Sequence, residues 1–443
     1  MRLFFACSML AVLVASCAGT RRSERFFTKN LPREIQQSPV FRQSFTGFTL
    51  LDPATGRILC DVNGDHYFIP ASNTKIMTLY ACLKVLGDSV PGLRYIAQDS
   101  SLYVFGTGDP SFLHPQFQQW RRSFSFLKTS PNIYRVPNRD GWTILGPGWA
   151  WDDIDEYYSP EMSDLPVYGN VRRLYATADG RLALAPAFWQ KTFFRDSVAA
   201  SRDSLQIARF NNQIHYNARK IWAKDFERWI PIRNAGLETR AMLSDTLKKS
   251  MVQLDASNPE WSTSIRKKTL FSTPIDTVLR RMMHQSDNFI AEQMLLVCAG
   301  KKFDLLRQDT VIRWILDFSL ANLPQRPKWS DGSGLSRYNL NSPQSLTQVL
   351  LRLWQEQPRE RLFSLFPAGG VTGTITDWYK GKNGKPYVFA KSGSMSGVYC
   401  LSGYVVRNNG KVLIFSFMHN NFTGSSRPWR AEMQRLLEEI AER

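Results

Sequence analysis

The sequence predicts an α+β fold in which helices flank an antiparallel sheet, interrupted by a large inserted domain. Two hairpin signals at opposite ends of the chain indicate the sheet. Residues 45–62 contain two apolar strands around a turn at residues 52–56, where Pro and Gly supply the turn chemistry. Strands expected at residues 401–406 and 412–418 are joined through Asn-Asn-Gly at residues 408–410, a strong hairpin pattern. One sheet could contain both hairpins.

Helical spacing marks segments that should pack on this sheet. After the first hairpin, Ile76, Leu79, Leu83 and Leu86 recur on one helical face, and Gly87 suits a C-terminal cap. Near the end of the chain, one apolar face is formed by Trp429, Met433, Leu436, Leu437 and Ile440. We therefore expect a helix beside each hairpin.

The composition changes in the middle of the chain. Residues 99–272 are rich in Trp, Tyr, Asp, Arg and Pro and contain no clear repeat or low-complexity tract. We interpret them as an inserted domain, with residues 41–98 and 273–443 forming one discontinuous domain. The chain has 443 residues, 43% hydrophobic and 21% charged, which is enough for two or three domains with a large core.

The first residues resemble an export signal. Arg2 precedes an apolar run over residues 3–15, which is too short for a comfortable membrane span and fits the core of a signal peptide. Residues 14–17, Val-Ala-Ser-Cys, resemble the lipobox of bacterial lipoproteins, in which the signal is removed before the Cys and the Cys then carries lipid. Several acyl chains on one residue anchor a protein durably. We therefore expect a signal peptide over residues 1–16 and lipidation of Cys17.

This reading places the protein in the periplasm or cell envelope as a membrane-anchored lipoprotein. A polar tether is expected over residues 17–40. The alternative is ordinary signal cleavage near Ala18, with Cys17 incidental. Four further cysteines are widely spaced in apolar stretches and are expected to be buried free thiols, although disulfide pairing stays open: Cys60, Cys82, Cys298 and Cys400.

Net charge alone does not decide the function. The formal charge is +18, which would suit nucleic acid, an anionic membrane or an acidic polymer. The sequence has no long Lys/Arg block, no zinc-finger spacing and no aromatic-basic RNA signature, so no nucleic-acid partner is expected. A diffusely basic exported protein is the simplest interpretation.

The first candidate catalytic motif is Ser72-Asn73-Thr74-Lys75, expected at the start of the first helix. A spacing of three places Ser72 and Lys75 on one helical face. A buried Lys has a lowered pKa and can accept the Ser proton, which activates the hydroxyl as a nucleophile. The motif is weak alone, because Ser125 with Lys128 and Ser264 with Lys267 share its spacing. For such a pair, a helix cap and a surface Lys are the ordinary interpretation.

Two more motifs follow in order. Ser286-Asp287-Asn288 precedes an apolar helical stretch, where Ser can pass a proton and Asn can hold a peptide, although all three residues also favour helix N-caps. Lys391-Ser392-Gly393-Ser394 precedes an apolar strand, where Lys and a hydroxyl suit a carboxylate and Gly leaves the strand edge open. In this order, the three motifs form the penicillin-recognising set.

The surrounding segments resemble the class C low-molecular-mass penicillin-binding proteins, which are D-alanyl-D-alanine carboxypeptidases and endopeptidases. The similarity spans nearly the whole mature chain. It is carried by residues 68–75 (FIPASNTK), 102–110 (LYVFGTGDP), 148–153 (GWAWDD), 331–337 (DGSGLSR) and 390–398 (AKSGSMSGV). The resemblance implies a β-lactamase/transpeptidase-like domain carrying the insertion.

The resemblance also implies catalytic roles. Ser72 would be the acylated nucleophile, Lys75 its general base, and Ser286 a proton-transfer group. Backbone N–H groups of Ser72 and Ser394 would form the oxyanion hole. Neither a metal nor an organic cofactor is implied, and the five His residues form no H-E-x-x-H pattern.

Substrate recognition follows from the same resemblance. Asn288 would hold the peptide, Lys391 and Ser392 would bind its terminal carboxylate, and Asp153 would help read the diamino-acid side chain. The expected partners are peptidoglycan peptides, with β-lactams as inhibitors. The alternative is a catalytically silent, peptidoglycan-binding lipoprotein.

The chain departs from the family pattern at two places. Its K-S-G replaces K-T-G but keeps the hydroxyl. Downstream of Gly373, Trp378 and Tyr379 occupy a region where the family often has an Arg. A class A β-lactamase is disfavoured because no E-x-x-L-N segment is present. The balance of carboxypeptidase and endopeptidase activity, the oligomeric state, the membrane leaflet and the number of inserted subdomains stay open.

Overall fold

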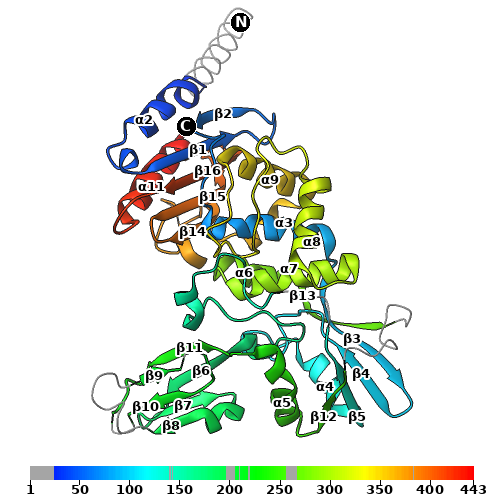
Figure 1. Ribbon diagram of the computed structural model, residues 1–443. Coiled ribbons are helices and arrows are strands. Elements are labelled where there is room, and N and C mark those ends of the chain that lie inside the picture. Colours follow the sequence, from blue (N-terminus) through cyan, green and yellow to red (C-terminus); the bar gives the residue numbers. More distant parts are fainter. Residues whose placement is uncertain are drawn as a thin grey trace, which may run out of the picture.

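The computed structural model describes residues 24–443, except residues 139–140, 142, 196–204, 209, 218–219, 256–266 and 383. The predicted signal peptide and Cys17 lie outside the described residues. The molecule has two parts stacked along its long axis, with both described ends of the chain in the upper part (Figure 1).

The upper part is built on one antiparallel sheet with the strand order β14-β15-β16-β1-β2. The strands are β1 Phe45–Leu51, β2 Ile58–Val62, β14 Val388–Met395, β15 Val398–Val406 and β16 Val412–Asn420. Phe45 pairs with Asn420, and Leu51 with Ile414. The prediction that the two terminal hairpins share one sheet is therefore confirmed. Every residue of β16 is buried, because helices cover both faces of the sheet.

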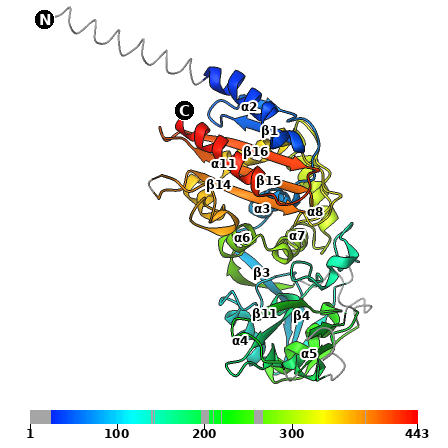
Figure 2. The ribbon, with the colours of Figure 1, turned by 90° about the vertical axis from the view of Figure 1, so that its left-hand side faces the viewer.

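One face of the sheet carries the terminal helix α11 Arg427–Glu442 and the N-terminal helix α2 Leu31–Gln37, as Figure 2 shows. Trp429, Met433 and Leu437 pack there with Phe415 and Leu31 in one apolar cluster. The predicted apolar stripe of the terminal helix is therefore confirmed.

The other face carries α3 Lys75–Val85, α7 Asn288–Phe303 and α9 Pro343–Glu356. These helices and their neighbours share a second apolar cluster that includes Leu79, Met294 and Leu350. The remaining helices of the upper part are α6 Ile275–His284, α8 Gln308–Trp314 and α10 Arg359–Leu365. The core therefore lies on both sides of the sheet.

Two local expectations differ from the structure. Residues 26–37, expected within a polar tether, are helical, and Phe26, Phe27, Leu31 and Ile35 are buried against the sheet. Gly87 does not cap α3, since the helix ends at Val85 with Leu86 already extended as the chain turns towards β3.

The chain enters the lower part through β3 Ser89–Gln98 and leaves it through β13 Lys268–Pro274. These two strands pair with each other. Its main sheet has the order β12-β5-β4-β3-β13, with β4 Ser101–Phe105, β5 Asn132–Val136 and β12 Met251–Gln253. Helices α4 Arg121–Thr129 and α5 Ala235–Leu247 accompany it. The strand β3 belongs to this sheet, although the sequence placed it before the insertion.

Two small sheets complete the lower part. One has the order β11-β6-β7, with β6 Val171–Ala176, β7 Leu182–Ala185 and β11 Glu227–Pro231. The other has the order β8-β10-β9, with β8 Phe193–Arg195, β9 Leu205–Ile207 and β10 Ile214–Tyr216. A third apolar cluster joins these strands to α5 and to the main lower sheet.

The four cysteines that the structure describes are buried and free, as the sequence predicts. Cys82 on α3 and Cys298 on α7 are neighbours, with their sulfur atoms 3.8 Å apart. Among the described helices, none is long and apolar enough to cross a membrane.

Candidate active site

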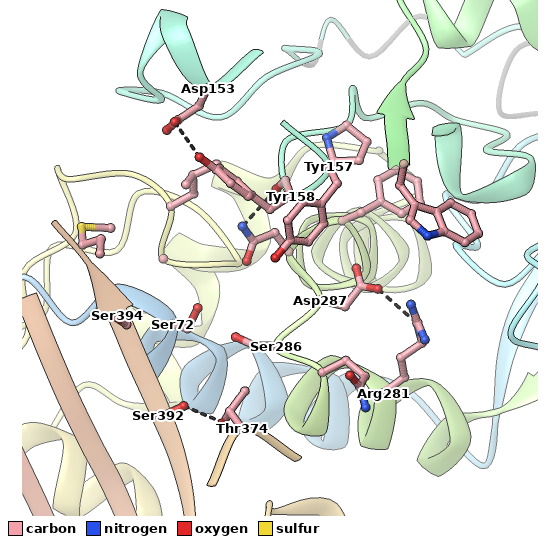
Figure 3. Close-up of a pocket in the computed structure, with 18 of the residues that line it drawn as sticks. Ser72, Asp153, Tyr157, Tyr158, Arg281, Ser286, Asp287, Thr374, Ser392 and Ser394 are labelled. Atoms are coloured by element: carbon pink, nitrogen blue, oxygen red, sulfur yellow. Dashed lines mark hydrogen bonds and ion pairs between the residues drawn. The ribbon is translucent and has the colours of Figure 1, made fainter. Parts of the chain in front are cut away.

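A cleft of about 840 Å³ is lined by residues of both the upper and the lower part of the molecule. Its lining includes six of the residues singled out in the sequence: Ser72, Asp153, Ser286, Asn288, Ser392 and Ser394. Figure 3 shows Ser72, Ser286 and Ser392 in the lower half of the view, with Asp153 and Tyr158 above them across the cleft. Lys75 and Lys391 are fully buried.

Ser72 lies in a single turn of 3-10 helix, η3 Ala71–Thr74, that leads directly into α3. The turn is entered through Ala71, whose φ is +46°. Thr74 donates its hydroxyl to the Ala71 carbonyl, which fixes the turn. Lys75 is the first residue of α3, and its Nζ donates to Ser72 Oγ at 3.0 Å. The predicted pair is therefore in hydrogen-bond contact.

All three donors of the Lys75 ammonium are satisfied. They reach Ser72 Oγ at 3.0 Å, Asn288 Oδ1 at 2.7 Å and the Ser333 carbonyl at 2.8 Å. Burial lowers the pKa of Lys75 to about 8, although the carboxylates of Glu292, Asp331 and Asp287 oppose that shift. An amine that loses its proton near neutral pH beside a hydroxyl is suited to general-base chemistry.

The segment Ser286-Asp287-Asn288 directs its three side chains in three directions. Ser286 has a φ of +55°, which turns the chain just before α7. Asp287 is the N-cap, accepting from the Ile290 N–H, and its other oxygen pairs with Arg281. Asn288 accepts from Lys75 and donates to the Tyr158 carbonyl. The capping role and the cleft-facing roles therefore coexist in one motif.

Lys391 lies within the edge strand β14, not before a strand as the sequence suggested. Its Nζ donates to Ser286 Oγ at 2.9 Å and to the Ser392 carbonyl at 2.6 Å. Burial lowers its pKa well below the ordinary value, and Lys75 adds to the shift. The Lys391 Nζ therefore contacts Ser286, whereas the hydroxyls of Ser392 and Thr374, 2.6 Å apart, face the cleft.

Gly393 allows β14 to approach the nucleophile. A Cβ atom at this position would lie 2.5 Å from the Pro70 carbonyl oxygen and 3.0 Å from the Ser72 nitrogen. Both distances are too short for a methyl group beside backbone atoms. The strand therefore brings Ser394 and the Ser72 turn to the same end of the cleft only because residue 393 has no side chain.

Sequence reasoning missed the supports of Lys75. Glu292, one turn after Asn288 on α7, accepts from the Gly332 N–H at 2.9 Å and the Ser333 N–H at 2.7 Å. Asp331 accepts from the Gly334 and Ser336 N–H groups. These bonds fix the loop that presents the Ser333 carbonyl to Lys75. The sequence signal for this loop was the resemblance of residues 331–337 to the family segment, which did not indicate a role for them.

Asp153 lies on the lower side of the cleft, in the 3-10 helix η4 Trp151–Asp155. Its carboxylate accepts the Tyr158 hydroxyl at 2.7 Å (Figure 3). Tyr158 also presents its carbonyl to Asn288, so Asp153 is connected to the catalytic side through one residue. A carboxylate at this position gives the lower wall a negative group.

Known proteins match this chain over most of its length. A sequence model of the D-Ala-D-Ala carboxypeptidase 3 (S13) family matches residues 27–440. The D-alanyl-D-alanine carboxypeptidase DacB of Haemophilus influenzae is 23% identical over 433 residues, 86% of each protein. The D-alanyl-D-alanine carboxypeptidase of an Actinomadura species is 24% identical, over 88% of this chain and 80% of that protein.

Solved structures agree with the fold. Penicillin binding protein 4 from Haemophilus influenzae superposes with a TM-score of 0.74 at 21% identity, covering 94% of this chain and all of that one. The same protein complexed with a novel β-lactam gives a TM-score of 0.67. The predicted transpeptidase-like α+β fold is therefore confirmed.

Proposed function

Because the chain belongs to the D-Ala-D-Ala carboxypeptidase 3 (S13) family, we propose that Ser72 attacks the amide carbonyl between the two terminal D-alanines of a peptidoglycan stem peptide. The chain is a serine-type D-alanyl-D-alanine carboxypeptidase, as its motifs predict. The observation that carries the assignment of Ser72 is the 3.0 Å hydrogen bond from a fully buried Lys75. No other serine of the cleft is bonded to an amine in the same way except Ser286, whose partner is Lys391.

Acylation begins when neutral Lys75 takes the Ser72 proton as Oγ bonds to the carbonyl carbon. Backbone N–H groups of Ser72 and Ser394 receive the developing oxyanion. When the amide C–N bond breaks, Ser286 gives its proton to the departing amine and regains one from the Lys75 ammonium, which leaves Lys75 neutral again. Water then adds to the ester carbonyl as Lys75 takes one of its protons. Lys75 passes that proton to Ser72 Oγ when the ester C–O bond breaks, so the enzyme ends unchanged.

The substrate lies along the outer edge of β14 beyond Ala390, because residues 367–369 already pair with residues 388–390. An extended peptide can pair with this part of the strand, since β14 is the last strand of the sheet. The hydroxyls of Ser392 and Thr374 receive the terminal carboxylate, and the Asn288 amide contacts the peptide. Across the cleft, Asp153 attracts the cationic end of the diamino-acid side chain. A β-lactam occupies the same place, and its ring carbonyl acylates Ser72.

The same geometry bears on two alternatives, a catalytically silent binder and an endopeptidase. A silent peptidoglycan binder has no use for a buried amine bonded to a hydroxyl, so the pair of Ser72 and Lys75 disfavours it. Endopeptidase action uses the same acyl-enzyme with the amine of a cross-link as the leaving group, and the open cleft accommodates both.

Mass spectrometry of the penicillin-treated enzyme tests the assignment of Ser72. We expect one penicilloyl adduct per chain, on the proteolytic peptide that contains Ser72, and release of one D-alanine from a pentapeptide. A chain that shows neither an adduct nor D-alanine release would be a silent binder. An adduct on the peptide containing Ser286 would move the nucleophile to the second motif.

Lipidation of Cys17 is the corresponding proposal for localisation in the cell envelope. The described chain begins at Glu24, just beyond the proposed anchor, and its first helices pack on the catalytic sheet. A lipid on Cys17 would therefore hold the catalytic domain close to the membrane surface. We expect Cys17→Ser to move the protein from the membrane fraction to the soluble fraction. An unmodified mature N-terminus at Ala18 would contradict the proposal.

A further inference from the structure

Arg430 is a cation of the cleft that has no acidic partner among the residues that the structure describes. It lies in α11 and is partly exposed where it lines the cleft. Its Nε is buried and has no hydrogen-bond partner. The donors of this guanidinium that can reach a ligand are therefore those on its two Nη atoms.

Two aromatic rings fix the position of this guanidinium. Its central carbon lies 4.7 Å from the ring centre of Tyr399 and 5.8 Å from that of Trp378. Stacking on aromatic faces holds an Arg in place without using its N–H donors. The guanidinium is therefore held in place, and its Nη donors are available for an anion in the cleft.

The register of the sheet places Arg430 on the hydroxyl-bearing face of β14. Ser394 pairs with Tyr399, and Ser392 pairs with Leu401. Directly paired residues project from the same face, so both hydroxyls share the face on which Tyr399 and Leu401 pack with α11. Lys391, one residue from Ser392, projects from the opposite face towards Ser286.

The other basic residues near the cleft have hydrogen-bond partners away from the Ser392 and Thr374 hydroxyls. Lys391 donates to Ser286 and to the Ser392 carbonyl, and Arg281 pairs with Asp287. Arg337 has no acidic partner among the described residues, but it donates to the Ser396 carbonyl, beyond the end of β14. The hydroxyls of Ser392 and Thr374 offer hydrogen bonds but no charge. An anion bound to them therefore has Arg430 as its unpaired cation on the same face.

We propose that Arg430 is a specificity-determining residue that binds the terminal carboxylate of the substrate together with the Ser392 and Thr374 hydroxyls. This inference rests on the proposed function of the cleft. A guanidinium and a carboxylate form a planar, bidentate pair, which a point charge such as a Lys ammonium does not reproduce. Arg430 thus selects peptides that end in a free carboxylate over peptides whose end is capped.

The test compares one substrate pair in five proteins: wild type, Arg430→Gln, Arg430→Lys, Arg337→Gln and Arg427→Gln. The substrates are an N-acetylated L-Lys-D-Ala-D-Ala peptide with a free carboxylate and the same peptide with a C-terminal amide. We expect Arg430→Gln to lower kcat/KM for the free acid by about 10- to 100-fold, the range for losing one hydrogen bond between charged groups, and to leave the amide almost unchanged. Arg430→Lys should recover part of the loss.

Arg427 provides the matched control, because it is an exposed residue of the same helix and does not line the cleft. Arg427→Gln should keep the wild-type preference for the free acid. The ratio of kcat/KM for the free acid to kcat/KM for the amide is compared among the proteins, because partial unfolding lowers both values alike and leaves the ratio unchanged. Acylation by a penicillin and by its methyl ester gives a second comparison that does not depend on deacylation.

Three results would overturn the inference. Arg430→Gln could lower activity on both substrates equally, which indicates a structural role, or on neither, which indicates a surface cation. Alternatively, Arg337→Gln could remove the preference that Arg430→Gln leaves intact. In all three cases wild-type D-alanine release and penicillin labelling would stand. A wild type lacking both would instead refute the proposed function, and this inference with it.

Discussion

Replacing Ser72 by alanine is expected to abolish penicillin labelling and to lower kcat for D-alanine release by roughly 10⁴- to 10⁶-fold, as for other serine nucleophiles. The reason is that no other described group can take its place. The nearby Ser286 hydroxyl is not bonded to Lys75. Its partner is the buried Lys391. The substitution removes only one small polar atom beside Lys75, so the fold should be retained.

Ser125→Ala is the matched control for this prediction. Ser125 and Lys128 have the same spacing as Ser72 and Lys75, but they lie on α4 in the lower part of the molecule, and neither lines the cleft. Labelling and D-alanine release should be unchanged in this variant. Retention of a stoichiometric penicilloyl adduct by Ser72→Ala would contradict the assigned nucleophile.

The upper sheet was predictable because its signals are local. Each terminal hairpin carries its own turn residues and apolar strands, and β1 and β16 are the edges that the two hairpins offer each other. The three motifs could likewise be found in the sequence. What joined Ser72, Ser286 and Lys391 into one site was the resemblance to a family, since the spacing of residues far apart in a chain does not place them together.

The interior contacts of the site were not predictable in the same way. Lys391 was expected to bind the carboxylate, which stays a prediction, but no sequence pattern indicated that its Nζ is buried and bonded to Ser286 Oγ. Glu292 resembles any acidic residue on a helix until the fold buries it under the 331–337 loop. Burial and partner choice depend on tertiary packing, which local patterns do not encode.

The N-terminal segment is more ordered than the sequence analysis predicted. The stretch before the first strand was interpreted as a tether because charged and polar residues are frequent in it. Its apolar residues Phe26, Phe27, Leu31 and Ile35 nevertheless recur on one helical face and pack on the sheet. Arg430 was overlooked for a related reason, because a single Arg in the first turns of an amphipathic helix is typical of its solvent face.

Replacing Lys75 by methionine is expected to lower kcat/KM for acylation by about 10²- to 10⁴-fold, the usual contribution of a general base. Methionine is an unbranched side chain only one atom shorter than lysine, but it cannot accept a proton from Ser72. It also withdraws the donor from Asn288 Oδ1 and the Ser333 carbonyl, while removing a buried charge. These changes oppose each other in stability, so a variant with nearly normal Tm and little activity would identify the role as chemical.

The pH profile separates this role from a structural one. Burial lowers the pKa of Lys75 to about 8, and only the neutral amine can act as the base. Wild-type kcat/KM should therefore fall about tenfold per pH unit below pH 8 and level off above it. Lys75→Met should lose this limb. Lys84→Met, a change on the same helix α3 that breaks only a half-exposed ion pair with Glu356 of α9, should keep it. A limb at the same pH in Lys75→Met would assign it to another group, of which Lys391 is the nearest amine.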